Sequence, residues 1–186
     1  MAKNTYTRGE INALLSKCSI RRPTGLRDKA LIVFMWRSGL RISEVLGLRI
    51  RDINFQYSTV NVLGKNNKQR TVGLDFITGD ILRQWIARRR TFNFEKNTPL
   101  FCTLGGKALH QQNVRDMLLR RARRAGINKR VHPHGFRHTY SQELVRENTN
   151  VKYIQQLLGH SSLATTDIYL SSLGSYDAIN ITRNRS

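Results

Sequence analysis

Three histidines and one arginine lie close together in the segment HPHGFRHTY, residues 132–140. If a helix begins near His134, then His134, Arg137 and His138 fall at positions i, i+3 and i+4 and share one face. Arginine offers a planar, permanently charged fork for two oxygens, and an imidazole can donate or accept a proton near neutral pH. The pattern is therefore typical of a site for a phosphate group.

Two other interpretations of this segment stay open from these residues alone. Two histidines four apart can bind one zinc ion, but the glutamate of an HExxH motif is absent and no nearby Cys, Asp or Glu supplies a third ligand. The histidines can equally be capping and surface residues, with His132 and Pro133 at the helix entry. We expect no metal, and His132 receives no role.

Other candidate side chains lie at the ends of predicted elements. Arg41, in SGLRISEVLGLR, follows a glycine that can end a helix and precedes the next helix, where a side chain is held rigidly. Lys65, in GKNNKQRTV, lies at the tip of a predicted hairpin. In LLGHSSLATTDIYL, Gly159 and His160 end one helix and Tyr169 lies on the next. Taken singly, these residues fit a surface turn, a solvated lysine and a core tyrosine equally well.

The elements that must position these residues are mostly helical. Thr7 and Glu10 predict a capping box, followed by apolar residues at helical spacing. A second helix is predicted from about 24 to 38, with Gly39 suited to the left-handed residue that ends it, and a third, shorter helix follows. Between 52 and 74, short β-branched segments predict a small antiparallel sheet. Helical patterns return at about 78–92, 111–125, 134–148, 151–158 and 163–172.

Charge is the strongest feature of the composition. The 186 residues include 32 Lys and Arg against 12 Asp and Glu, a formal net charge of +20. This excess predicts a polyanionic partner, with nucleic acid as the first candidate and an anionic membrane surface as the second. No lipidation motif or clean basic amphipathic helix supports the membrane. The longest apolar run, 30–36, is too short to span a bilayer, and no signal peptide is seen.

These features predict a cytoplasmic protein, associated with the nucleoid or with a host cytoplasm if viral. Cys18 and Cys102 lie far apart without a CxxC pair, which predicts free thiols. No repeat or linker interrupts the chain, so a single domain is expected over 1–186. Arginines are concentrated between 83 and 130, where two helices should expose them to DNA phosphates. These candidate DNA contacts are Arg88, Arg89, Arg120, Arg121, Arg123 and Arg124.

The candidate residues together resemble the catalytic signature of a known family. The ordered set is Arg41, Lys65, His134-Gly135-Phe136-Arg137-His138, Leu158-Gly159-His160 and Tyr169. It is similar to the signature of the tyrosine recombinases, the phage integrase family. Each piece alone is weak, but the order and the spacing of nine residues from His160 to Tyr169 are specific. Phe136 stands where many relatives have Leu, a change in packing that should be harmless.

The resemblance implies a mostly α fold with a small antiparallel sheet (α+β), and an enzyme that cuts and rejoins DNA without metal, cofactor or ATP. It makes Tyr169 the nucleophile of a 3′-phosphotyrosyl intermediate, with Tyr176 as an off-spacing rival. By the same resemblance, the scissile phosphate is bound by Arg41, Arg137 and His160, His134 is the base and Lys65 the general acid. Glu44 would orient the cationic pocket, and His138 would buttress it. These residue types suit phosphoryl transfer, which depends on positioning and on neutralising charge.

The implied partners are double-stranded DNA and further copies of the chain, four on two duplexes. Most relatives begin with a separate helical domain that clamps DNA, so this chain is expected to be a minimal recombinase, a fragment, or a member that relies on an accessory DNA-binding protein. The tail, 171–186, would dock on a neighbouring protomer. Alternatives are a DNA-binding accessory protein that lost the reaction, a type IB topoisomerase that relaxes supercoils, and a structural basic protein such as a ribosomal one.

Overall fold

A computed structural model describes residues 5–64 and 67–159 of the chain. The elements in order are α1 (Arg8–Ser16), α2 (Pro23–Ser38), α3 (Ile42–Gly47), the short 3-10 helix η1 (Ile50–Asp52), β1 (Ile53–Asn54), β2 (Thr59–Leu63), β3 (Gln69–Gly73), α4 (Phe76–Arg90), α5 (Gln111–Arg124), α6 (Pro133–Arg146) and α7 (Val151–Leu158). The predicted fold class, mostly α with a small antiparallel sheet, is confirmed. The helix predicted at 163–172 lies outside the described residues.

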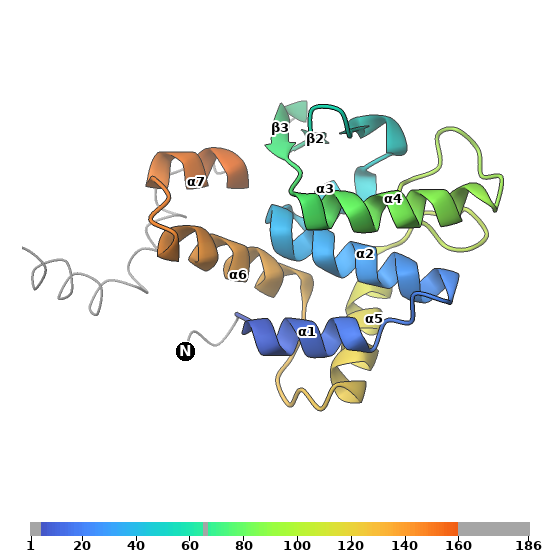
Figure 1. The fold of residues 1–186 in the computed structure, drawn as a ribbon, viewed down its shortest axis with the longest axis horizontal. Helices are drawn as coiled ribbons and strands as arrows, with labels where there is room; N and C mark the ends of the chain where they lie inside the picture. Colours follow the sequence, from blue (N-terminus) through green and yellow to red (C-terminus); the bar gives the residue numbers. More distant parts are fainter. Residues whose placement is uncertain (1–4, 65–66, 160–186) are drawn as a thin grey trace, which may run out of the picture.

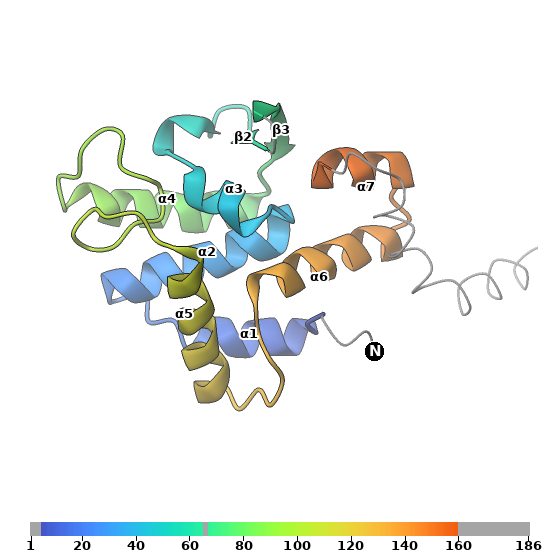
Figure 2. The ribbon, with the colours of Figure 1, turned by 180° about the vertical axis from the view of Figure 1, so that it is seen from behind.

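Helix α2 is the centre of the fold. Its apolar run, residues 30–36, is buried along its whole length, as expected of a helix that is apolar on all sides. Helix α4 packs along one side of α2 and α6 packs against another, while α5 crosses below them (Figures 1 and 2). The helix ends at Gly39, which has φ +61°, a conformation that glycine adopts without steric cost. This predicted helix end is therefore confirmed.

Helix α1 begins at the predicted capping box. The backbone N–H of Glu10 donates to the hydroxyl of Thr7 over 3.2 Å, and the backbone N–H of Thr7 donates to the Glu10 carboxylate over 2.8 Å. These bonds satisfy donors that a helix start leaves without partners. Ile11 and Leu14 form the buried face of α1, which packs beside α5.

The three strands form one antiparallel sheet in the order β1-β2-β3. Val60 pairs with Val72, and Val62 pairs with Arg70, in the register that joins β2 to β3. The buried valines mark the inner face of the sheet, which lies above α3 and the start of α4 in Figure 1. The sheet therefore packs close to α3. Lys65, at the predicted tip of the hairpin, lies outside the described residues.

The apolar helices and the two cysteines were also subjects of sequence predictions. None of the helices in the described ranges combines the length and the apolar character needed to cross a bilayer. Cys18 and Cys102 are both buried and unbridged, as predicted.

Candidate active site

Helix α6 carries the motif of histidines and arginine, and His132 is the residue that caps its N-terminus. The Nδ1 of His132 accepts a hydrogen bond from the backbone N–H of Gly135 over 3.3 Å, and Pro133 occupies the first helical position. The predicted start near His134 is thus one residue late, and His132, which had no predicted role, is the helix N-cap. The cap fixes the direction in which the first turn of α6 presents its side chains.

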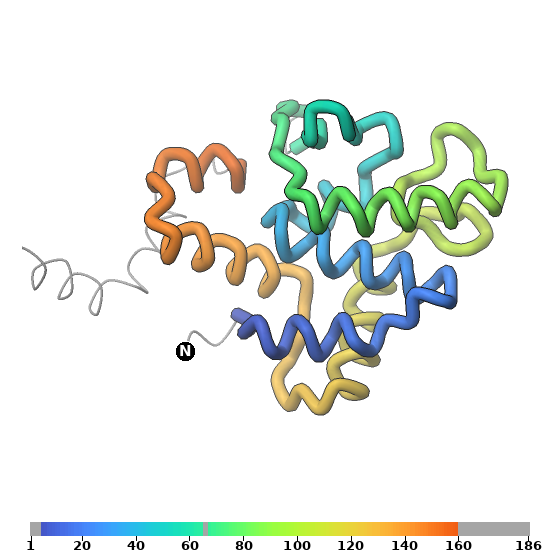
Figure 3. The backbone as a smooth tube through the Cα atoms, viewed as in Figure 1, coloured from blue at the N-terminus to red at the C-terminus, as the bar shows by residue number. Residues whose placement is uncertain are grey.

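Tyr6 holds this first turn from a distant part of the sequence. Its hydroxyl donates to the carbonyl of His132 over 3.0 Å and accepts from the His132 backbone N–H over 2.8 Å. The backbone N–H of Tyr6 donates to the hydroxyl of Thr139 over 2.9 Å. In Figure 3 the blue start of the described chain accordingly lies beside the orange α6. The helix that carries His134 and Arg137 is therefore anchored to the segment before α1.

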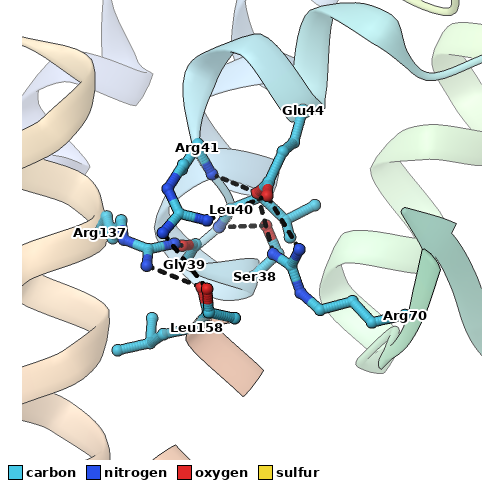
Figure 4. A network of polar contacts seen from close by, with 9 residues as sticks. Ser38, Gly39, Leu40, Arg41, Glu44, Arg70, Arg137 and Leu158 are labelled. Atoms are coloured by element: carbon cyan, nitrogen blue, oxygen red, sulfur yellow. Dashed lines mark hydrogen bonds and ion pairs between the residues drawn. The ribbon is translucent and has the colours of Figure 1, made fainter. Parts of the chain in front are cut away.

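Arg137 joins three segments that are far apart in the sequence. Its side chain is almost fully buried, with 3% of the residue exposed. One guanidinium nitrogen donates to the carbonyl of Gly39 over 2.8 Å, and another donates to the carbonyl of Leu158 over 2.7 Å (Figure 4). Arg137 therefore binds the ends of α2 and α7 together.

Arg41 lies at the start of α3, beside Arg137. Its Nη2 donates to the carbonyl of Gly159 over 3.3 Å, and its Nη1 lies 3.3 Å from the carboxylate of Glu44. The Arg41 side chain remains 40% exposed. Arg41 and Arg137 thus contact adjacent carbonyls at the end of α7, so the fold brings these two predicted phosphate ligands together.

Glu44 is buried between two arginines. Its side chain is 4% exposed, and its two carboxylate oxygens accept from the two terminal nitrogens of Arg70 over 2.8 and 2.9 Å. Burial acts to raise the pKa of Glu44, but the hydrogen bonds and charges of Arg70 and Arg41 outweigh it, so the pKa lies below its usual value. Glu44 is therefore ionised at neutral pH. The sequence interpretation found Glu44 but missed Arg70.

His134 and His138 contact each other on the predicted common face. Their ring centroids are 4.2 Å apart and the ring planes are nearly perpendicular, at 83°. Partial burial, with the positive charges of Arg137, His132 and Arg41, lowers the pKa of His134. Burial and the neighbouring His134, His132 and Arg137 lower the pKa of His138 to about 4. Both imidazoles are therefore neutral at neutral pH, and a neutral imidazole can accept a proton.

The charges of the described site favour an anion. Three guanidinium groups and one carboxylate leave two net positive charges around the ends of α2 and α7. Within 5–64 and 67–159, no three His, Cys, Asp or Glu side chains gather closely enough to hold a metal ion. This site can neutralise the negative charge of a phosphodiester through guanidinium groups.

Three predicted catalytic residues, Lys65, His160 and Tyr169, lie outside the described residues, as do Tyr176 and the tail 171–186. Gly159 ends α7, as predicted, with φ +62°. His160 follows it directly in the sequence, next to the residue whose carbonyl contacts Arg41.

The arginines predicted to contact DNA fall into different environments. Arg120, Arg123 and Arg124 are exposed on α5. Arg88 on α4 donates to the carbonyl of Arg21 over 3.2 Å, and Arg121 forms an ion pair with the buried Asp28 over 2.9 Å.

The expectation that all these arginines lie on exposed faces is wrong for Arg89. This side chain is 5% exposed and donates to the carbonyls of Thr98 and Pro99 over 2.9 and 3.1 Å. The physical reason is helical spacing, since Arg89 follows Trp85 and Ile86 on the apolar face of α4. Its guanidinium is used inside the protein.

Comparison with known proteins identifies the group to which this arrangement belongs. The model of the phage integrase family matches residues 4–174, nearly the whole chain. The chain belongs to the phage integrase family. The resemblance seen in the sequence is thereby confirmed.

Two bacterial relatives match most of this chain. A tyrosine recombinase XerC of Mannheimia succiniciproducens is 34% identical over 160 residues, which cover 86% of this chain and 54% of the relative. A tyrosine recombinase XerD of Lacticaseibacillus casei is 34% identical over 167 residues, or 89% of this chain and 57% of the relative. The chain therefore spans about half the length of the curated relatives that it matches.

Solved structures of recombinases share the fold. The crystal structure of XerA recombinase superimposes with a TM-score of 0.84 at 27% identity, covering 98% of this chain and 65% of XerA. A XerH site-specific recombinase bound to its difH substrate, in a pre-cleavage complex, gives a TM-score of 0.77 at 26% identity, covering 93% of this chain and 53% of XerH. These likenesses confirm the predicted recombinase catalytic fold.

Proposed function

We propose that this protein is a site-specific DNA recombinase that cleaves and rejoins DNA through a 3′-phosphotyrosyl intermediate. The observation that carries the proposal is the convergence of Arg41 and Arg137 on the end of α7, directly before His160. Family membership supports it, since the matched relatives are named tyrosine recombinases. The partner is double-stranded DNA.

The two arginines supply the binding of the scissile phosphate. The carbonyls that they contact, at Leu158 and Gly159, are neutral acceptors, whereas the non-bridging oxygens of a phosphodiester carry a full negative charge. A guanidinium bond to either acceptor has an ionised donor, but only the phosphodiester adds an opposite charge on the acceptor, so it attracts the arginines more strongly. The half-exposed fork of Arg41 is thus placed to take a phosphate oxygen, with His160 as the third ligand.

Proton transfer completes the reaction. Tyrosine has a pKa near 10, so Tyr169 needs a base or a strongly cationic site before it attacks at neutral pH. The lowered pKa of His134 leaves its imidazole neutral at neutral pH, and it lies in the first turn of α6 on the same face as Arg137. His134 is therefore our candidate base. Lys65 would protonate the leaving 5′-oxygen. His138, in contact with the ring of His134, would hold that ring in place.

Covalent attachment to Tyr169 would conserve the energy of the phosphodiester bond, so rejoining would need no ATP. The same positioning would act in reverse, with the free 5′-hydroxyl of a partner strand as the attacking group. Strand exchange then requires further copies of the chain on the DNA, and we propose four on two duplexes. The tail 171–186 would link neighbouring copies, and an accessory DNA-binding protein would be a further partner.

The exposed arginines on α5 are the proposed non-specific DNA contacts. Arg120, Arg123 and Arg124 can approach phosphates without breaking an ion pair within the described chain, and they contribute to the net charge of +20. Contacts of this kind position a protein on DNA and make its affinity dependent on salt. Arg121 and Arg88 would contribute less, because part of their bonding capacity is used within the protein.

A covalent-adduct assay tests the proposed function. Wild type, Tyr169→Phe and the control Tyr153→Phe, which alters a tyrosine that is 61% exposed on α7, are incubated with nicked duplexes in buffer with chelator. We expect a protease-sensitive protein–DNA adduct on a denaturing gel for wild type and the control, and none for Tyr169→Phe. DNA binding without an adduct on any substrate would instead favour an accessory DNA-binding protein.

A further inference from the structure

The β2–β3 hairpin contributes a cation to the site. Arg70 lies on β3 opposite Val62, and its side chain is 17% exposed. Both terminal nitrogens of its guanidinium bind the two oxygens of Glu44, over 2.8 and 2.9 Å (Figure 4). A paired contact of this kind fixes both groups in one plane, which a single bond cannot do.

The same carboxylate holds Arg41. One Glu44 oxygen accepts from the backbone N–H of Arg41 over 2.8 Å, and the other lies 3.3 Å from its Nη1. The guanidinium of Arg41 is therefore held more loosely by Glu44 than that of Arg70, and it is the more exposed of the two. Glu44 thus anchors the backbone of Arg41 while most of its charge is matched by Arg70.

Arg70 also contacts the end of α7. A Cβ placed on Gly159 would lie 3.0 Å from the Cζ and from the Nη1 of Arg70, so the glycine packs directly against the guanidinium. The carbonyl of Gly159 in turn accepts from Arg41. The arginine on the strand therefore contacts both the carboxylate behind Arg41 and the residue before His160.

We propose that Arg70 is a positioning residue of the phosphate site, which neutralises Glu44 so that the guanidinium of Arg41 stays available to the phosphate and which supports the end of α7. This proposal rests on the proposed recombinase function. It assigns Arg70 no contact with DNA.

The physical reason is competition for Arg41. Without Arg70, the buried Glu44 carboxylate would have Arg41 as its nearest cation, and a buried carboxylate requires a partner. Arg41 would then form the paired contact with Glu44 and turn away from the phosphate. With Arg70 present, one positive and one negative charge cancel, and the charges of Arg41 and Arg137 remain for the phosphate.

Single-turnover cleavage of a nicked duplex tests this proposal. The variants are Arg70→Gln, Arg70→Lys and the double variant Glu44→Gln/Arg70→Gln, with Arg21→Gln as the control at an exposed arginine between α1 and α2. We expect Arg70→Gln to cleave about 10- to 100-fold more slowly, somewhat less than the loss of a direct charge-stabilising donor. Its affinity for DNA at the same salt should stay near that of wild type, because Arg70 is largely buried.

The double variant separates positioning from a merely structural role. Because glutamine in place of Glu44 has no charge, it cannot capture Arg41, so the double variant should cleave several-fold faster than Arg70→Gln. A purely structural role predicts the opposite order, since two buried partners are removed instead of one. Arg70→Lys keeps the neutralising charge and should cleave faster than Arg70→Gln. If Arg70→Gln does not fold, the comparison of Arg70→Lys with wild type and with the double variant replaces it.

Two results would overturn the proposal. One is an Arg70→Gln rate within about twofold of wild type, below the smallest loss expected for a charge-positioning group. The other is a double variant no faster than Arg70→Gln. If wild type itself forms no adduct on any substrate, the proposed recombinase function fails instead, so the two failures are distinguishable.

Discussion

The ring of Tyr6 fills the space that a side chain at position 135 would occupy. A Cβ on Gly135 would meet the hydroxyl and two ring carbons of Tyr6, whose hydroxyl also bonds the backbone of His132. The glycine within HGFRH is therefore required by a residue far away in the sequence. The segment before α1 and the first turn of α6 are one structural unit.

Gly135→Ala should destabilise the protein, although alanine is normally favoured over glycine in a helix. We expect a loss of about 1–3 kcal/mol in the free energy of unfolding, because the new methyl group collides with Tyr6. Gly47→Ala on α3, where nothing lies within 4 Å of the new Cβ, is the matched control and should be neutral or stabilising by up to about 1 kcal/mol. Urea unfolding measures both, and equal effects would contradict the Tyr6 contact.

Substitutions of Arg41 and Arg137 should both reduce cleavage, but only the substitution of Arg137 should strongly reduce the stability of the protein. Arg41→Gln removes a half-exposed side chain, so we expect less than about 1 kcal/mol of destabilisation but a loss of adduct formation of about 10²–10³-fold. Arg137→Gln also breaks two buried bonds to Gly39 and Leu158, so we expect roughly 2–4 kcal/mol of destabilisation in addition to lost cleavage. Thermal unfolding and the gel assay measure the two effects, and equal stabilities would disprove the structural role of Arg137.

His138 should make stability depend on pH. Its folded-state pKa is about 4, below the 6.5 of an exposed histidine, so the unfolded chain binds more protons between these values. Stability is therefore fully present above about pH 6.5 and falls as the pH is lowered toward 4. In His138→Gln this contribution is absent, and the slope of unfolding free energy against pH should become shallower over that window. An unchanged slope would show that His138 is not the titrating group.

The α5 arginines should set the salt dependence of DNA binding. Removing one phosphate-binding arginine should reduce the slope of log affinity against log salt by about 0.9, so the triple variant Arg120→Gln/Arg123→Gln/Arg124→Gln should lose about two to three units of slope. Arg89→Gln is the control, since that side chain is buried and should alter stability but not the slope. A titration with random-sequence duplex measures this, and a triple variant with the wild-type slope would place the DNA surface elsewhere.

Local signals in the sequence predicted the start of α1 and the end of α2. The capping box of Thr7 and Glu10 and the left-handed Gly39 depend on residues within a few positions of each other, and both are confirmed. The common face of His134 and His138 follows from helical spacing alone, and their rings do meet. Features of this kind can be found without knowledge of the tertiary fold.

The missed role of Arg70 depends on a contact between distant segments. Arg70 binds Glu44 across 26 positions, and only packing of the sheet against α3 brings them together. A signal was nevertheless present, since Arg70 lies two residues before the buried Val72 and so on the inner face of β3. Arg89 carried a similar signal, three and four residues after Ile86 and Trp85 on α4.

The contacts of Arg41 and Arg137 with the end of α7 also determine how much of the chain must be synthesised before the site can assemble. Arg41 is synthesised early, but its partner carbonyl at Gly159 is 118 positions later, and Arg137 bonds the carbonyl of Leu158. At about 5–20 residues per second, roughly 6–24 s of translation separate the two halves. A chain that stops before α7 has arginines but no assembled phosphate site. In the proposed recombinase, the contacts of Arg41 and Arg137 therefore delay assembly of the phosphate site until α7 has been synthesised.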